Sequence, residues 1–162
     1  MASCHKTEAG IQLCLEANEV DLIRFLGREL RRLMEHGDAS QTGLRPFYPS
    51  LQRQRDPESV PSDLEEEMDK ELMRLRLARI ETIQDSLLAQ RESGGDLNVI
   101  LDETQTDIWL AYLADLRLLL SVVIGITPRD PDPFVDRDRE DWTMEMNMYE
   151  FLSVIQEWLL QS

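Results

Sequence analysis

The sequence has little of what a catalytic or metal site needs. Only two cysteines, Cys4 and Cys14, and two histidines, His5 and His36, occur among 162 residues. Two cysteines without histidine pairs make neither a disulfide framework nor a zinc site, and a di-iron bundle would need Glu-x-x-His pairs, which are absent. The HExxH, GxGxxG, P-loop and GxSxG motifs are missing as well. We therefore predict a non-enzymatic protein with no catalytic residues, no metal and no cofactor.

Basic residues are scarce relative to acidic ones. Seventeen Lys and Arg residues face 32 Asp and Glu residues, which gives a formal net charge of -15. Such a charge repels a nucleic-acid backbone and the anionic face of a membrane. We therefore expect the partner to be another protein, and neither nucleic acid nor a membrane. The opening residues, MASCHKTEAG, contain no apolar signal segment, and this predicts a cytoplasmic protein.

Apolar periodicity predicts a mostly α-helical fold. Leucine, isoleucine and methionine recur at helical spacing in four segments, 17–36, 63–91, 102–125 and 141–160. Two short alternating segments, GIQLCL and LNVIL, predict strands. An isolated strand leaves its backbone groups unpaired. We therefore expect about four main helices in an irregular bundle, beside a two-stranded β-ribbon that pairs 10–15 with 97–101.

The length of the chain favours a single domain over residues 1–162. Its irregular parts are predicted to be a flexible terminus at 1–9, a Pro- and Gly-rich connection at 37–61 and an acidic loop at 127–141. A structureless connection as long as 37–61 is uncommon in a compact domain. We expect Phe47, Tyr48 and Leu51 to hold it against the core.

The two predicted strand–helix units resemble each other at a fixed spacing along the chain. Each strand is followed by an acidic residue with Glu or Gln three positions later, the pattern of a helix-capping box. Further along each helix an acidic residue, a leucine and an arginine follow one another. These triplets are Glu29-Leu30-Arg31 in the first unit and Asp115-Leu116-Arg117 in the second. This internal similarity predicts two related strand–cap–helix hairpins.

The most apolar stretch, DIWLAYLADLRLLLSVVIGIT at 107–127, is about as long as a bilayer is thick. Asp115 and Arg117 lie in its middle, and each would cost about 2.5–3.5 kcal/mol at a bilayer centre. A capping box formed by Asp102 and Gln105 is also a device of water-exposed helix ends. We therefore predict a central helix packed on several sides and not a membrane span.

Two charges in a mostly buried helix need partners. Asp115 and Arg117 are two positions apart, so they point in different directions and cannot pair with each other. Arg31 or Glu29 on the matching helix are candidate partners in a structural ion-pair network. The alternative is a small-molecule pocket lined by Trp109, Asp115 and Arg117, with Arg31 as a further candidate binding residue.

The region from 28 to 55 holds the one concentration of arginines, namely Arg28, Arg31, Arg32, Arg45, Arg53 and Arg55. These arginines are expected to pair with the surplus of acidic residues in the same chain. The alternative is a DNA-binding transcriptional regulator. Aromatic residues are few in this region and the overall charge is repulsive, so both features oppose that alternative.

The segment IWLAYLADLRLLLSVVIGIT, the acidic loop after it and YEFLSVIQEWLLQ resemble an actinobacterial domain-of-unknown-function family. The matching positions in the first segment are Trp109, Leu110, Leu113, Asp115, Leu116, Arg117, Leu118, Gly125 and Ile126. The chain departs from the family at Ser121-Val122-Val123, where members often have Gly-Thr-Arg.

The resemblance implies no reaction and no catalytic residues. Genes of this family often neighbour the substrate adaptor of the Clp protease, and some members carry a transcriptional-regulator label. The expected function is therefore protein–protein interaction in an accessory or regulatory role, and the gene neighbourhood suggests a link to Clp proteolysis. A homo-oligomer is possible, because the helix at 63–91 changes from acidic to basic along its length and could pair antiparallel with itself.

Overall fold

The computed structural model describes residues 1–36, 47, 62–127 and 129–161. Within these residues four α-helices and a small antiparallel sheet are present, so the predicted mostly helical fold is confirmed. In chain order the elements are β1 Ser3–Thr7, β2 Gly10–Leu15, α1 Ala17–His36, α3 Asp63–Gln90, β3 Leu97–Leu101, α4 Glu103–Ile124 and α5 Met144–Gln161. A short 3-10 helix, Arg139–Asp141, precedes α5.

The sheet has the strand order β1-β2-β3, and both pairs are antiparallel. The predicted pairing of 10–15 with 97–101 is confirmed, with Ile11 opposite Leu101. The two-stranded ribbon is wrong in its strand count, because residues expected in a flexible terminus at 1–9 form β1. The polar sequence SCHKT has no apolar alternation to predict a strand. It is held in place by a tight turn to β2 and by the backbone ladder.

Gly10 makes the close approach of these strands possible. Its φ of 146° lies in a region that L side chains rarely adopt. A Cβ atom at this position would also lie 2.1 Å from the carbonyl oxygen of Leu101. The hydroxyl of Thr7 donates a hydrogen bond of 2.8 Å to the Gly10 carbonyl and closes the turn.

The helix ends follow the sequence signals closely. Asp102 and Gln105 form the predicted capping box at the start of α4, and Gly125 ends the helix in a left-handed conformation with φ 83°. In the matching unit the Glu19 side chain accepts a hydrogen bond of 2.8 Å from the Glu16 backbone N–H, as Gln105 does from Asp102 at 2.9 Å. The internal similarity between the two units therefore extends to their helix caps.

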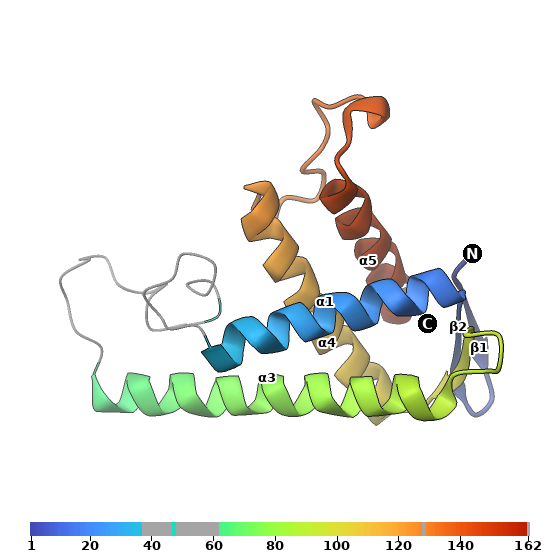
Figure 1. Cartoon of the computed structure of the whole chain (residues 1–162), viewed down its shortest axis with the longest axis horizontal. Helices are drawn as coiled ribbons and strands as arrows, with labels where there is room; N and C mark the ends of the chain where they lie inside the picture. Colours follow the sequence, from blue (N-terminus) through green and yellow to red (C-terminus); the bar gives the residue numbers. More distant parts are fainter. Residues whose placement is uncertain (37–46, 48–61, 128, 162) are drawn as a thin grey trace.

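Figure 1 shows how the helices are arranged. The long helix α3 forms one edge of the molecule, and α1 runs alongside it at a shallow angle. Helices α4 and α5 form an antiparallel hairpin. Helix α4 begins beside α3 and crosses behind α1, and the sheet lies at the end where α3 finishes. The core consists of residues from all these elements, among them Leu13, Ile23, Leu30, Ile80, Ile83, Leu87, Leu113, Leu116, Leu152 and Ile155. No helix in the described part of the chain is long and apolar enough to cross a membrane.

A polar contact joins the centres of three helices. The Tyr112 hydroxyl on α4 donates to the backbone carbonyl of Ile23 on α1 at 3.0 Å, and Gln84 on α3 donates to that of Arg24 at 3.2 Å. A Cβ atom at Gly27 would lie 2.1 Å from the Tyr112 hydroxyl oxygen. Gly27 therefore lets the tyrosine reach the α1 backbone.

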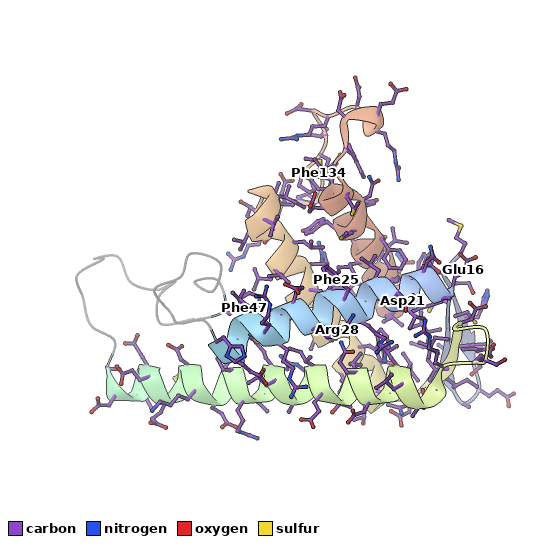
Figure 2. The ribbon with its side chains drawn as sticks, in the orientation of Figure 1. Glu16, Asp21, Phe25, Arg28, Phe47 and Phe134 are labelled. Atoms are coloured by element: carbon purple, nitrogen blue, oxygen red, sulfur yellow. The ribbon has the colours of Figure 1, made fainter. Side chains whose placement is uncertain are left out.

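The predicted irregular connection at 37–61 lies outside the described residues except for Phe47. The Phe47 side chain is fully buried, as expected, and Figure 2 shows it between the C-terminal part of α1 and α3. The acidic loop at 127–141 is described except for residue 128. It contacts the core through Phe134, whose ring packs edge-on against Trp142 and Tyr149 at centroid distances of 4.9 and 5.9 Å. The assignment of 1–162 to one domain stays a prediction.

Candidate functional site

Asp115 is buried on the side of α4 that faces α3, with 7% of its surface exposed. Its two carboxylate oxygens lie 3.3 Å from Arg76 Nε and 3.4 Å from Arg79 Nη2. The expected pairing with Arg31 is therefore wrong, because α3 and not α1 supplies the partners. Burial raises the pKa of the Asp115 carboxyl above its ordinary value, against the opposing attraction of both arginines.

Arg76 also contacts Phe47. Its Nη1 donates a hydrogen bond of 2.6 Å to the Phe47 carbonyl oxygen, and its guanidinium lies 5.1 Å from the centroid of the Phe47 ring. Burial lowers the pKa of Arg76. The Asp115 cluster, formed by Asp115, Arg76 and Arg79, thus joins α4 to α3 and to Phe47.

Arg117 points to the other neighbour of α4. Its two terminal nitrogens donate to Gln156 Oε1 at 2.6 Å and to the Tyr149 hydroxyl at 3.0 Å, both on α5. Its guanidinium also lies 4.9 Å from the centroid of the Tyr149 ring. The prediction that Asp115 and Arg117 face different ways is confirmed, and each charge has partners on a neighbouring helix.

The four candidate site residues do not form one site. Trp109 is buried, lies 6.2 Å from Tyr112 between ring centroids, and lines a small cavity of about 100 Å³ with residues of α3, among them Thr82 and Ser86. Arg31 is on the surface, where its Nε lies 3.0 Å from Glu35. Asp115 and Arg117 line neither this cavity nor two larger ones formed by described residues.

Sequence reasoning missed the partners of both charges. Arg76 and Arg79 are three positions apart, within a helix whose buried residues include Met73, Ile80 and Ile83. Two arginines within the apolar stripe of a helix are the one feature of the sequence that could have predicted this buried ion pair. Gln156 is one of the last-helix positions that match the family, but no pattern indicated it as a partner of Arg117, because one glutamine in an amphipathic helix is usually exposed.

Two arginines of α1 contact acidic residues of the same helix. Arg31 pairs with Glu35, and Arg32 Nη2 lies 2.7 Å from Glu29. Arg28 is exposed. The other members of the Arg-rich region, Arg45, Arg53 and Arg55, lie outside the described residues.

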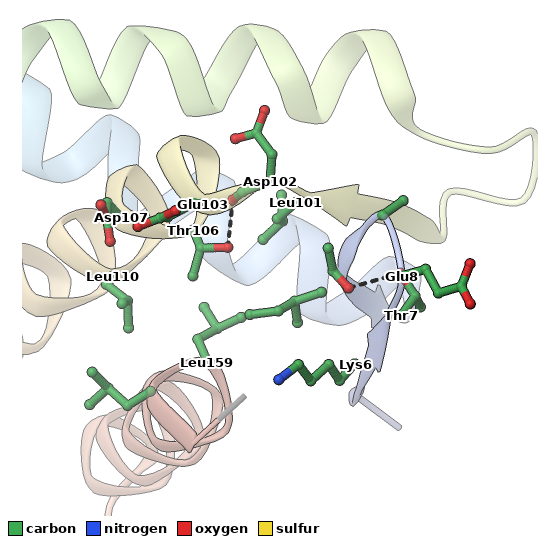
Figure 3. Close-up of a pocket in the computed structure, with 14 residues that line it drawn as sticks. Lys6, Thr7, Glu8, Leu101, Asp102, Glu103, Thr106, Asp107, Leu110 and Leu159 are labelled. Carbon is green, nitrogen blue, oxygen red and sulfur yellow. Dashed lines mark hydrogen bonds between the residues drawn. The ribbon is translucent and has the colours of Figure 1, made fainter.

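The largest of these cavities is a groove of about 510 Å³ between the β1–β2 hairpin, the start of α4 and the end of α5. Its apolar lining comes from Ile11, Leu101, Leu110, Leu159 and Leu160, and its charged lining from Lys6, Glu8, Asp102, Glu103 and Asp107. Figure 3 shows Glu103 and Asp107 close together on α4, and Lys6 reaching from β1 toward α5. We call this feature the end groove.

The lining of the end groove suits binding better than catalysis. It contains no histidine, cysteine or serine, and its two threonine hydroxyls donate to backbone carbonyls. These bonds run from Thr106 to Asp102 and from Thr7 to Gly10, each at 2.8 Å. Leu160 and the half-buried Leu110 offer apolar surface, whereas Leu101 and Leu159 are each 2% exposed. Four carboxylates against one lysine favour a cationic group.

The two cysteines lie on opposite faces of the sheet. Cys4 is opposite Leu13, and Cys14 is opposite Ser3, so the side chains of the two cysteines alternate across the β1–β2 pair. Cys14 thus points away from Leu13 and Leu15, as predicted, and its Sγ lies 3.6 Å from Asn98 Oδ1. The two residues are not joined by a disulfide.

Together these features define a mostly helical protein whose internal charges connect its helices and whose described residues form an apolar groove with an acidic rim. The chain belongs to the family described as Domain of unknown function (DUF2017), whose model matches residues 1–162. It is also similar to proteins named Oxidative stress regulator AosR from Mycobacterium tuberculosis and Mycobacterium bovis, with 35% identity over 69 residues. The match covers 43% of this chain and only 30% of each relative. No solved structure matches the chain.

Proposed function

We propose that this protein is a non-enzymatic regulatory or accessory factor that acts by binding another protein. The observation that carries the proposal is the chemistry of the end groove. The groove combines exposed carboxylates with a leucine surface, and both threonine hydroxyls are engaged in the fold. Such a surface can hold a peptide that presents an apolar side chain next to Lys or Arg.

The overall charge supports a basic partner. A net charge of -15 speeds the encounter with a positively charged surface and slows the encounter with an acidic one. The engagement of Asp115 and Arg117 by neighbouring helices also supports a surface site over a pocket beside these two residues.

The names of the mycobacterial relatives support a regulatory role. A regulator of oxidative stress can sense oxidants through cysteine thiols. Cys4 and Cys14 would have to leave their strand pairing to form a disulfide, because they face opposite sides of the sheet. We therefore propose regulation through protein contact and not through a disulfide between these two cysteines.

The Clp machinery is our proposed setting for this contact, on the gene neighbourhood that the family resemblance implies. Co-purification of the tagged protein with Clp subunits or their adaptor would support this link. Recovery of the bait alone would remove the Clp link and leave the proposed contact with another protein standing.

The proposed function is tested by a pull-down from native lysate at physiological salt, followed by mass spectrometry. Glu103→Lys with Asp107→Lys reverses two exposed charges at the groove and should abolish capture of the specific partner. Asp136→Lys with Asp138→Lys makes the same charge change in the exposed 127–141 loop and should leave capture intact. Equal capture by both double variants would contradict the role of the groove.

DNA binding through 28–55 is the rival in another functional class. Titration of the protein with a labelled duplex at about 50 mM salt separates the two, because low salt favours phosphate contacts. We expect no binding under these conditions. Tight binding that falls steeply with salt would replace our proposal with a DNA-binding regulator.

A further inference from the structure

The first half of α3 carries large apolar side chains that face away from the core. Leu64, Met68 and Leu75 are 71%, 47% and 42% exposed. The buried apolar residues of this helix are Met73, Ile80, Ile83 and Leu87, which lie on its other side. Figure 1 shows that this end of α3 extends past the C-terminal end of α1.

These residues follow the spacing of a coiled-coil seam. From Leu64 the steps of four, three and four lead through Met68 and Glu71 to Leu75. Steps of this kind keep side chains in one line along a helix that packs against a second helix. We call this line, Leu64, Met68, Glu71 and Leu75, the α3 stripe.

The charges beside the α3 stripe change sign along the helix. Acidic residues come first, namely Asp63, Glu65 and Glu67, and the basic residues Lys70 and Arg74 follow. Parallel pairing of two such helices would bring acids against acids. Antiparallel pairing brings the acidic end of each helix against the basic part of the other, which is favourable.

We propose that a second copy of this chain packs antiparallel on the α3 stripe. With the twofold axis between Asp69 and Lys70, Leu64 lies against Leu75 of the second copy. Met68 then lies against Glu71 of the second copy, and Glu67 lies beside its Arg74. The dimer therefore buries all the apolar residues of the stripe and forms two equivalent ion pairs.

Glu71 is the one polar member of the α3 stripe. Arg74 neutralises it through hydrogen bonds of 2.6 and 3.0 Å and lowers the pKa of its carboxyl. A single polar residue in a helix seam weakens the pairing but fixes its register. The α3 stripe is also too short for a standard interface of roughly 800 Å² per partner, so the dimer dissociates on dilution.

Sedimentation velocity of the full chain, from low micromolar to near-millimolar concentration, tests the proposal. The wild type should change from monomer to dimer over this range, and Leu64→Glu or Leu75→Glu should stay monomeric. Leu88→Glu, at a position on the same helix that is 59% exposed but off the stripe, should dimerise like the wild type. Glu71→Leu should tighten the dimer at least tenfold. Circular dichroism shows whether each variant keeps its helices.

A charge exchange tests the antiparallel register. Glu67→Arg and Arg74→Glu should each weaken the homodimer by placing like charges side by side. An equimolar mixture of the two variants should recover association to within a few-fold of the wild type, because each chain then supplies the charge that the other needs. A wild type that is monomeric at every concentration would overturn the proposal. So would a mixture that stays monomeric, or loss of dimer in Leu88→Glu equal to that in Leu64→Glu.

Discussion

The triplets Glu29-Leu30-Arg31 of α1 and Asp115-Leu116-Arg117 of α4 occupy matching positions but have different surroundings. Leu30 and Leu116 are both fully buried. The charges of α1 lie at the surface, where Arg31 pairs with Glu35 and Glu29 with Arg32 on the same helix. The charges of α4 reach across to other helices.

The two triplets differ in their contacts because α4 packs against more helices at its triplet than α1 does. Helix α4 lies between α3 and α5, so the residue on each side of Leu116 meets another helix. The corresponding residues of α1 meet water. Exposed ion pairs within a helix contribute little to stability, whereas a buried charge that loses its partner is costly. The same triplet therefore forms surface ion pairs in one unit and connects helices in the other.

The largest effect should come from Asp115→Ala. It leaves Arg76 and Arg79, whose side chains are 13% and 27% exposed, without their carboxylate. We expect the free energy of unfolding in urea to fall by about 2–4 kcal/mol. Glu29→Ala, the matching change in α1, should cost below about 0.5 kcal/mol. Equal losses in the two variants would show that the surroundings of the two triplets are equivalent.

Arg117→Met should have the next largest effect. It removes two hydrogen bonds and the stacking on Tyr149 but keeps the aliphatic stem, so we expect a loss of about 1–3 kcal/mol in the same assay. Arg31→Met is its matched control and should change stability by less than about 0.5 kcal/mol. A negligible effect of Arg117→Met would mean that α5 does not depend on this contact.

Gly27 is another position at which the two strand–helix units differ, since the matching residue on α4 is the buried Leu113. Gly27→Ala should destabilise by about 1–3 kcal/mol, although alanine favours helices, because the new Cβ atom would meet the Tyr112 hydroxyl. Adding Tyr112→Phe removes that hydroxyl and should recover part of the loss. If the added Tyr112→Phe change does not recover stability, the new Cβ atom meets an atom other than the Tyr112 hydroxyl. Thermal unfolding followed by circular dichroism measures both variants.

The pH dependence of the Asp115 cluster should be the smallest effect. Because burial raises the folded-state pKa of Asp115 above 3.8, its carboxyl stabilises the fold most at low pH. The pH-dependent part of its contribution is lost as the pH rises through the folded-state pKa, whereas the pairing with Arg76 and Arg79 remains. The stability difference between wild type and Asp115→Asn should therefore shrink from acidic to neutral pH. A difference that grows with pH would show that Arg76 and Arg79 outweigh burial.

Local signals in the sequence predicted the helices, the caps and the pairing of two strands. The capping box of Asp102 and the stop at Gly125 depend on residues a few positions apart, so they are readable from the chain. The partners of Asp115 depend on how α3 packs against α4, and no local pattern reports that packing. β1 was missed because backbone pairing, rather than apolar alternation, holds it.

The candidate site was less predictable for the same reason. The end groove is assembled from three distant segments, and its exposed acids look in sequence like any solvated helix start. The candidate residues chosen from the sequence were unusual ones in apolar or repeated segments, namely Trp109, Asp115, Arg117 and Arg31. The structure uses the first three in packing and leaves Arg31 on the surface.

Our central claim is that the charges inside α4 hold the fold and that the end groove binds the partner. The most direct measurement compares partner capture by the folded variants Arg117→Met and Glu103→Lys/Asp107→Lys in the same pull-down. We predict that Arg117→Met is less stable yet captures the partner fully, and that the groove variant is stable yet captures none. Full capture by the groove variant together with loss in a folded Arg117→Met protein would contradict the account.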